Sequence, residues 1–332
     1  MKFANWYSEH IYPVLVNVFG RVTGIFPFSI VEILLYIVIV LLILTVVKII
    51  VYRIQKKDWK KQLKQSSMKW LLFAVVLLFL YVINCGINYR RESFTESIGV
   101  TLEKYTTEEL KEVCVWLTNE VNAEAAKVRR DSDGLMMLGD YAKEEAVASM
   151  QALGETYEDL AGYYPQPKGL LIPWILSIQD LSGIYSPFTV EANYNSAMVD
   201  YNIPFTMCHE LSHLKGFMQE QEANFIAFLA CRESEETEFH YSGNMLGWIY
   251  CMNVLYKNDY EAWEEARAML CDEANVDLAA NSEFWSRYDG TIAEVSNKVN
   301  DTYLKANGQA DGVESYNRMV DLIVDFYVRA NL

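Results

Sequence analysis

The chain has 332 residues, of which 52% are hydrophobic, and a formal net charge of −16. The length exceeds that of a typical single domain, and the acidic balance argues against nucleic acid as a partner, because nucleic-acid binding needs a basic face. The charge is unevenly divided: residues 1–88 contain ten Lys or Arg and three Asp or Glu, whereas the remainder is strongly acidic. Such a break predicts two parts in different environments.

Residues 1–28 are rich in aromatic side chains and are interrupted by Pro13 and Pro27. We expect an interfacial segment, with Trp6 and Tyr7 at the level of the lipid headgroups. A short helix that packs as part of the following domain is the alternative. A cleavable signal peptide fits poorly, because the first apolar run begins far along the chain and no small-residue cleavage pattern follows it.

Two long apolar runs follow, at residues 29–52 and 70–89. Each has about the 20 residues that a helix needs to cross a lipid bilayer. The segment between them, residues 53–69, carries seven Lys or Arg against a single acid, and short basic loops stay in the cytoplasm. We therefore predict two transmembrane helices in the cell membrane, with residues 90–332 as one domain on the extracytoplasmic side.

Residues 90–332 show mainly helical patterns. Thr106 and Glu109 are spaced as a capping box, and residues 140–157 predict a second helix. A proline-rich stretch comes next and predicts turns and short strands, among which "SPFTVEANYN" is the best strand candidate. The cysteines show no disulfide-like spacing, so we expect most of them to be buried as small apolar residues. The fold class is mainly α with a small β element.

The motif H-E-x-x-H occurs once, at His209, Glu210 and His213. Residues four apart share one face of a helix, so the two imidazoles can converge on one metal ion. Zn²⁺ accepts neutral imidazole nitrogen, and Glu210 beside the first histidine can act as general base toward a water that the metal activates. The motif therefore predicts a zinc hydrolase centre.

A catalytic zinc needs a third protein ligand, for which Glu220 and Glu222 are the candidates. Glu220 shares a helix face with two alanines and with Asn224, which could hydrogen-bond a ligand, whereas Glu222 points to a bulky apolar side. We favour Glu220 as the ligand and keep Glu222 open as the alternative.

Hydrolysis of an amide also needs a donor that stabilises the oxyanion. Tyr241 is the favoured catalytic candidate, and His240 beside it is the second. The strand candidate upstream of the motif could be an edge strand that pairs with an extended peptide substrate. Its polar side chains would then line the cleft, namely Glu191, Asn193 and Asn195.

Four stretches carry a resemblance, namely "TGIFPFSIVEILLY", "SGIYSPFTVEANYN", "PFTMCHELSHLKGFMQEQEANFIAFLAC" and "DTYLKANGQADGVESYNRMVDLI". Over nearly the whole chain they resemble a bacterial membrane-protein family catalogued as domain of unknown function 3810. The motif also resembles that of membrane-linked gluzincin peptidases, whose E-x-x-A-D glutamate binds zinc, which implies Glu220 as the ligand and a zincin-like metallohydrolase domain. Asn224 stands where those peptidases have Asp, so the metal would be tuned differently.

The sequence thus predicts a membrane-anchored zinc metallopeptidase that hydrolyses peptide bonds in a peptide or protein substrate. Zn²⁺ would be held by His209, His213 and Glu220, with Glu210 as the base. The alternative is a catalytically silent, metal-containing binding or sensor module at the cell surface. A membrane-protein partner that presents the substrate stays open.

Overall fold

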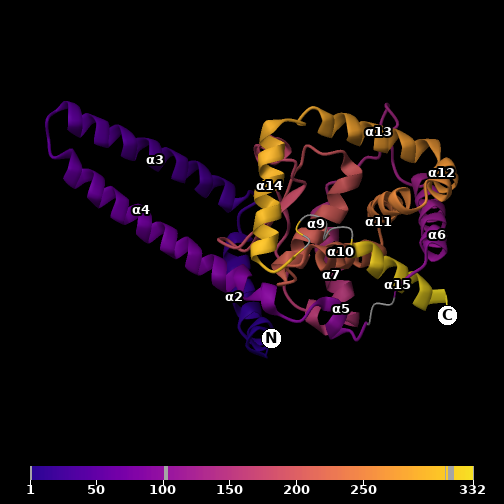
Figure 1. The fold of residues 1–332 in the computed structure, drawn as a ribbon. Coiled ribbons are helices and arrows are strands. Elements are labelled where there is room, and N and C mark those ends of the chain that lie inside the picture. Colours follow the sequence, from indigo (N-terminus) through magenta and orange to yellow (C-terminus); the bar gives the residue numbers. More distant parts are fainter. Residues whose placement is uncertain (1, 101–103, 311, 313–317, 332) are drawn as a thin grey trace.

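The computed structural model describes residues 2–100, 104–310, 312 and 318–331. Within these residues the protein is mainly helical, as predicted, with one small sheet. A long helical hairpin projects from the body of the molecule, which contains all the remaining elements (Figure 1).

The hairpin consists of α3 (Ile30–Ile54) and α4 (Trp59–Tyr81). Both are long and apolar enough to cross a membrane, and only 6% and 11% of their most apolar windows are buried, so they are not core helices of the body. The basic segment predicted as a loop is mostly helix, because α4 begins with Asp58 as a side-chain cap; only residues 55–58 connect the two helices. At its far end α4 passes into a π-turn (Val82–Gly86), which begins the root of the hairpin.

The segment before the hairpin forms α1 (Lys2–His10) and α2 (Tyr12–Thr23). Its aromatic residues do not all face outward: Tyr7 and Tyr12 are buried, and the Tyr12 hydroxyl donates to the carbonyl oxygen of Leu214 at 3.0 Å. Trp6 remains half-exposed. Both helices therefore pack against the body with part of their surface, and the interfacial placement of residues 1–28 stays a prediction.

Along the chain, the helices of the body come both before and after the strands of the sheet. Its helices are α5 (Phe94–Ser97), α6 (Thr107–Ala125), α7 (Ala142–Thr156), α8 (Trp174–Ser177), α9 (Ile203–Leu214), α10 (Glu220–Glu233), α11 (Thr237–Asn258), α12 (Tyr260–Ala268), α13 (Asp272–Ser286), α14 (Thr291–Ala306) and α15 (Met319–Asn331). The predicted capping box is present at the start of α6. The Thr106 side chain accepts a hydrogen bond from the Glu109 N–H, and the Glu109 side chain accepts one from the Thr106 N–H. Five of the six cysteines are buried, as expected.

The sheet has the order β1 (Lys168–Gly169), β3 (Glu191–Tyr194), β2 (Gly183–Ser186). β3 pairs in parallel with β1 and antiparallel with β2, with Ser186 opposite Glu191. The predicted strand is thus the central one and has no free edge for a peptide, which corrects the edge-strand expectation. β2 is an edge strand instead.

The core surrounds α9, which contacts α7, α10, α11 and both β2 and β3. Every residue of α9 except His209 is buried, and Figure 1 shows α9 and α10 in the interior of the body. Such a helix is apolar on several sides and has no solvent face. Its polar residues are therefore held in fixed surroundings.

Buried carboxylates join α3, the first candidate membrane helix, to the sheet. Glu191 of β3 accepts hydrogen bonds from the backbone N–H groups of Ile30 and Val31, at 3.0 and 2.9 Å, and pairs with Lys168 at 2.6 Å. Glu32 in turn accepts from the N–H groups of residues 171 and 172, each at 2.8 Å. The free N–H groups at a helix start favour a carboxylate, so Glu191 fixes where α3 leaves the body.

Replacing Glu191 with Ala should destabilise the protein, because Lys168 would stay buried without its partner and two N–H groups of α3 would lose their acceptor. We expect the free energy of unfolding to fall by about 3–5 kcal/mol, measured by denaturant titration of the full chain in lipid nanodiscs. The exposed Glu294→Ala is the matched control. Equal unfolding curves for the two variants would contradict this role.

Candidate metal centre

The helix that carries H-E-x-x-H begins and ends at recognisable signals. Pro204 lies in the first turn of α9, where its missing N–H costs nothing. The helix ends at Leu214, and Gly216 follows with a φ of +93°. A Cβ at Gly216 would also lie 3.2 Å from the Tyr12 ring, so glycine is needed for both the turn and the packing of α2.

Three side chains meet at the junction of α9 and α10. One ligand atom from each of His209, His213 and Glu220 lies within 4.8 Å of the others. The Glu220 Oε2 atom is 3.3 Å from the His209 Nε2 atom and 3.6 Å from the His213 Nε2 atom. All three side chains are about nine-tenths buried. Two nitrogens and one oxygen in this arrangement form a candidate metal site.

A backbone carbonyl fixes the orientation of His213. Its Nδ1 atom lies 2.8 Å from the carbonyl oxygen of Phe217, which can only accept, so Nδ1 carries the proton. The Nε2 atom is thereby turned toward Glu220 and is free to bind a metal. Within the described residues, the buried Nδ1 atom of His209 has no such partner.

The structure separates the two candidate glutamates. Glu220 opens α10 and faces the histidines, whereas Glu222 accepts hydrogen bonds from the Thr95 hydroxyl at 2.8 Å and the Thr95 N–H at 3.0 Å. Glu222 therefore holds the start of α5 and is turned away from the imidazoles. Burial raises its pKa although Thr95 opposes the shift.

Charge is concentrated at the three-residue cluster. Burial opposes ionisation of Glu220, yet His213 and His209 hold the pKa of that carboxyl well below its usual range. Burial would likewise lower the pKa of His213, but the Glu220 carboxylate outweighs it and raises that pKa to about 9. In the metal-free protein, Glu220 is thus a carboxylate that is compensated by a proton on His213.

Glu210 lies beside this cluster, against the edge strand. Burial raises its pKa to about 7, against the opposing effect of His209 and His213. Among the described residues, its buried Oε2 atom has no hydrogen-bond partner. A Cβ on Gly183 of β2 would come within 2.4 Å of the Glu210 Oε1 atom, so a larger residue there would displace this carboxyl group.

Sequence reasoning missed Tyr250 of α11, because it lies 30 residues beyond Glu220 and in no motif. Its half-buried ring lies beside the Asn224 amide and within electrostatic range of Glu220. Within the described residues, the side-chain N–H group of Asn224 has no hydrogen-bond acceptor. The predicted hydrogen bond from Asn224 to a metal ligand is therefore absent. The small and polar residues that share a face of α10 with Glu220 predict that Asn224 lies near the cluster. They cannot predict Tyr250, because this residue belongs to another helix.

The structure does not bring the predicted oxyanion donors to the cluster. Tyr241 is fully buried and its hydroxyl donates to Asp277 at 2.6 Å, while the His240 Nε2 atom lies 2.6 Å from the carbonyl oxygen of Ser234. Tyr241 also lies nine residues before Tyr250, which is about 13 Å along α11. The polar groups of Tyr241 and His240 are therefore engaged elsewhere.

The predicted cleft residues on β3 also have structural partners. Glu191 binds the start of α3, as described above. Asn193 donates to the carbonyl oxygen of Ile184, and Asn195 donates to the Ser177 hydroxyl at 2.9 Å. These three side chains hold the sheet together and do not line a cleft.

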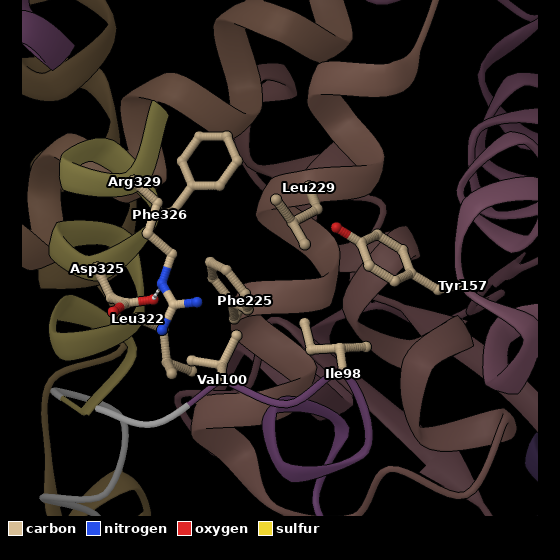
Figure 2. A pocket seen from close by; sticks show the side chains of 9 residues that line it. All are labelled: Ile98, Val100, Tyr157, Phe225, Leu229, Leu322, Asp325, Phe326 and Arg329. Atoms are coloured by element: carbon tan, nitrogen blue, oxygen red, sulfur yellow. Dashed lines mark ion pairs between the residues drawn. The ribbon is translucent and has the colours of Figure 1, made fainter. Parts of the chain in front are cut away.

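An apolar pocket of about 310 Å³ lies on the other side of α10 (Figure 2). Phe225 and Leu229 contribute to it from α10, and an ion pair between Asp325 and Arg329 of α15 lies at its side. Phe225 lies about 140° around the helix from Glu220. The pocket is therefore separate from the candidate metal centre.

Replacing Glu220 with Gln should lower zinc affinity by at least about a hundredfold, because the only carboxylate of the cluster is lost. The matched variant Glu222→Gln should leave zinc affinity unchanged and instead lower stability by about 1–3 kcal/mol, since Thr95 loses an acceptor. Competition titration with a chromogenic chelator measures the affinity. The reverse ranking of the two variants would overturn the assignment.

Zinc binding should release protons. His213 is protonated in the metal-free protein below about pH 9, and zinc needs the neutral imidazole, so about one proton should leave at pH 7. Affinity should then rise by up to about tenfold per pH unit between pH 7 and 9. Calorimetry in buffers of different ionisation enthalpy counts the protons. A flat affinity profile without proton release would contradict the charge state inferred for this cluster.

Comparison with known proteins places the chain in a family without assigning an activity. The model of the family described as Protein of unknown function (DUF3810) matches residues 7–324. No curated protein and no solved structure matches the chain. The match covers both the hairpin and the candidate metal centre, and the chain therefore belongs to the DUF3810 family.

Proposed function

We propose that the protein is a membrane-anchored zinc metallopeptidase. The observation that carries this proposal is the convergence of His209, His213 and Glu220 within 4.8 Å, beside a buried Glu210. Two imidazoles and one carboxylate match the ligand number of a catalytic zinc site, which keeps one position for water or substrate. A purely structural zinc site is usually closed by four protein ligands and has no use for a neighbouring base.

The ligands fit zinc on two further counts. The Nε2 atom of His213 is presented by a hydrogen bond on the opposite ring nitrogen, which is the usual way in which a protein fixes a metal-binding histidine. The Glu220 carboxylate is buried between two imidazoles, a position that favours a cation. When bound there, zinc would polarise a peptide carbonyl and make water available as a nucleophile near neutral pH.

Glu210 is the residue that would move the proton. Its Oε2 atom would accept a proton from the attacking water, and the water oxygen would bond to the carbonyl carbon. The same proton would then pass to the leaving amine nitrogen as the C–N bond breaks. A pKa of about 7 suits both steps, because the group can accept and return a proton at neutral pH.

We further propose that the body lies on the extracytoplasmic side. The segment that joins the two apolar runs, residues 53–69, includes seven Lys or Arg, and such basic segments stay in the cytoplasm. Both spans then bring the body to the opposite side. An intramembrane active site does not fit, because the candidate ligands lie in the body and not in α3 or α4.

Replacing Glu210 with Gln should leave zinc content unchanged and lower peptide cleavage by about 10²–10⁴-fold, the usual contribution of a general base. Cleavage of a peptide library by the full chain in nanodiscs, read by mass spectrometry, measures the rate. The exposed Glu233→Gln of α10 is the control and should cleave like the wild type. A wild-type protein that holds zinc and cleaves nothing would favour the silent binding or sensor module instead.

A further inference from the structure

We propose that the body lies with one face on the bilayer surface, through an apolar surface that surrounds the root of the hairpin. We call this surface the root surface; it is formed by the outer faces of α2 and α14 and by residues 171–174. The inference does not depend on the metal chemistry. It rests on exposed side chains and on their contacts with the membrane hairpin.

The first part of the root surface is a stripe along α2. Val14, Val18 and Val22 of α2 are 57–58% exposed, and Ile11 before the helix and Ile25 after it are exposed as well. The spacing of four residues places the three valines on one helix face. The opposite face is already used, because Tyr12 and Val16 are buried against the body. A second apolar face that stays in contact with water does not stabilise a helix. We therefore expect another apolar surface to cover this face of α2.

The second part is α14, which is weakly anchored in the body. Ala293 and Leu304 are its only buried residues. Ile292, Val295 and Val299 are between 54% and 63% exposed, and they share one face at helical spacing. The charged residues of α14 lie on the other side of the helix. An amphipathic helix with an uncovered apolar face is typical of a segment that lies in the membrane interface.

The third part is the loop that precedes and begins α8. Leu171, Ile172 and Trp174 are between 47% and 61% exposed. The backbone of this loop is tied to the hairpin, because the N–H groups of Leu171 and Ile172 both donate to Glu32 in the first turn of α3. A half-exposed tryptophan next to a membrane helix suits the headgroup region.

All three parts are continuous with the hairpin. α2 leads into α3 through residues 24–29, and the 171–174 loop binds Glu32. On α14, Tyr303 continues the apolar face and its ring packs against Tyr81, the last residue of α4, with centroids 6.2 Å apart. Figure 1 shows α14 and α2 on the side of the body from which the hairpin leaves.

This continuity identifies the bilayer as the occupant. A hairpin that crosses the membrane brings its root to the lipid–water boundary, and the root surface lies at that level. Three separate segments expose apolar side chains there. A bilayer can cover all three at once, whereas a single partner helix would cover only a narrow stripe. The metal centre lies close by, since Met218, two residues before Glu220, has its sulfur 3.7 Å from the Cys85 sulfur in the root.

Lipid quenching tests this placement on the full chain in nanodiscs that contain doxyl-labelled phosphatidylcholine. Single cysteines at Val18 and Val299 carry a bimane label, in a background where the half-buried Cys271 is Ser. Leu41 in the middle of α3 is the positive control. Tyr260, the first residue of α12, is the negative control, because it is 56% exposed and α12 lies on the side of the body away from the hairpin (Figure 1).

We expect doxyl lipid to quench the labels at Val18 and Val299 by about twofold or more, as for side chains buried in the interface, and to leave Tyr260 unchanged. Val22 and Val295 serve as second positions on the same faces. Quenching at Leu41 without quenching on α2 and α14 would overturn the proposal and indicate a protein as the cover. Absence of quenching at Leu41 would overturn it as well, since the hairpin would then not cross the bilayer.

Discussion

A carboxylate buried between two imidazoles is the constraint around which this structure is organised. Moving an ion out of water costs several kcal/mol unless a nearby opposite charge compensates it. In the protein alone, a proton on His213 compensates Glu220. A divalent cation would satisfy all three side chains at once, which is the physical reason for proposing a metal at this cluster.

The surrounding elements restrict how this cluster can be arranged. α9 has no solvent face, so its histidines cannot turn outward, and the Phe217 carbonyl fixes one of them. Gly183 leaves space for Glu210 at the edge strand. The same sheet anchors α3, the first candidate membrane helix, through Glu191, so both the candidate site and the hairpin contact one sheet.

Local sequence patterns predict the features of the fold and the site that depend only on the geometry of one or two helices. Helix geometry alone predicts that His209 and His213 share one face. It also predicts that Glu220 and Glu222 lie on different faces. The two apolar runs and the Thr106 capping box are equally local. The position of β3 in the sheet could not be predicted, because central and edge strands differ only in what pairs with them.

Other features depended on contacts between distant segments. Proximity in sequence favours Tyr241 as a donor, but its hydroxyl donates a hydrogen bond to Asp277, 36 residues further on. Tyr250 is near Asn224 only because α11 packs against α10. The segment before the hairpin has apolar residues on two faces of α2, so composition alone could not show that one of them covers the body.

X-ray absorption at the zinc edge, on full-length protein purified without chelators, shows whether the cluster binds zinc and through which atoms. We expect one zinc per chain, bound by two imidazole nitrogens and carboxylate oxygen at about 2.0–2.2 Å. Protein that holds no zinc even after zinc is added, or a spectrum dominated by sulfur ligands at about 2.3 Å, would contradict the proposed zinc site.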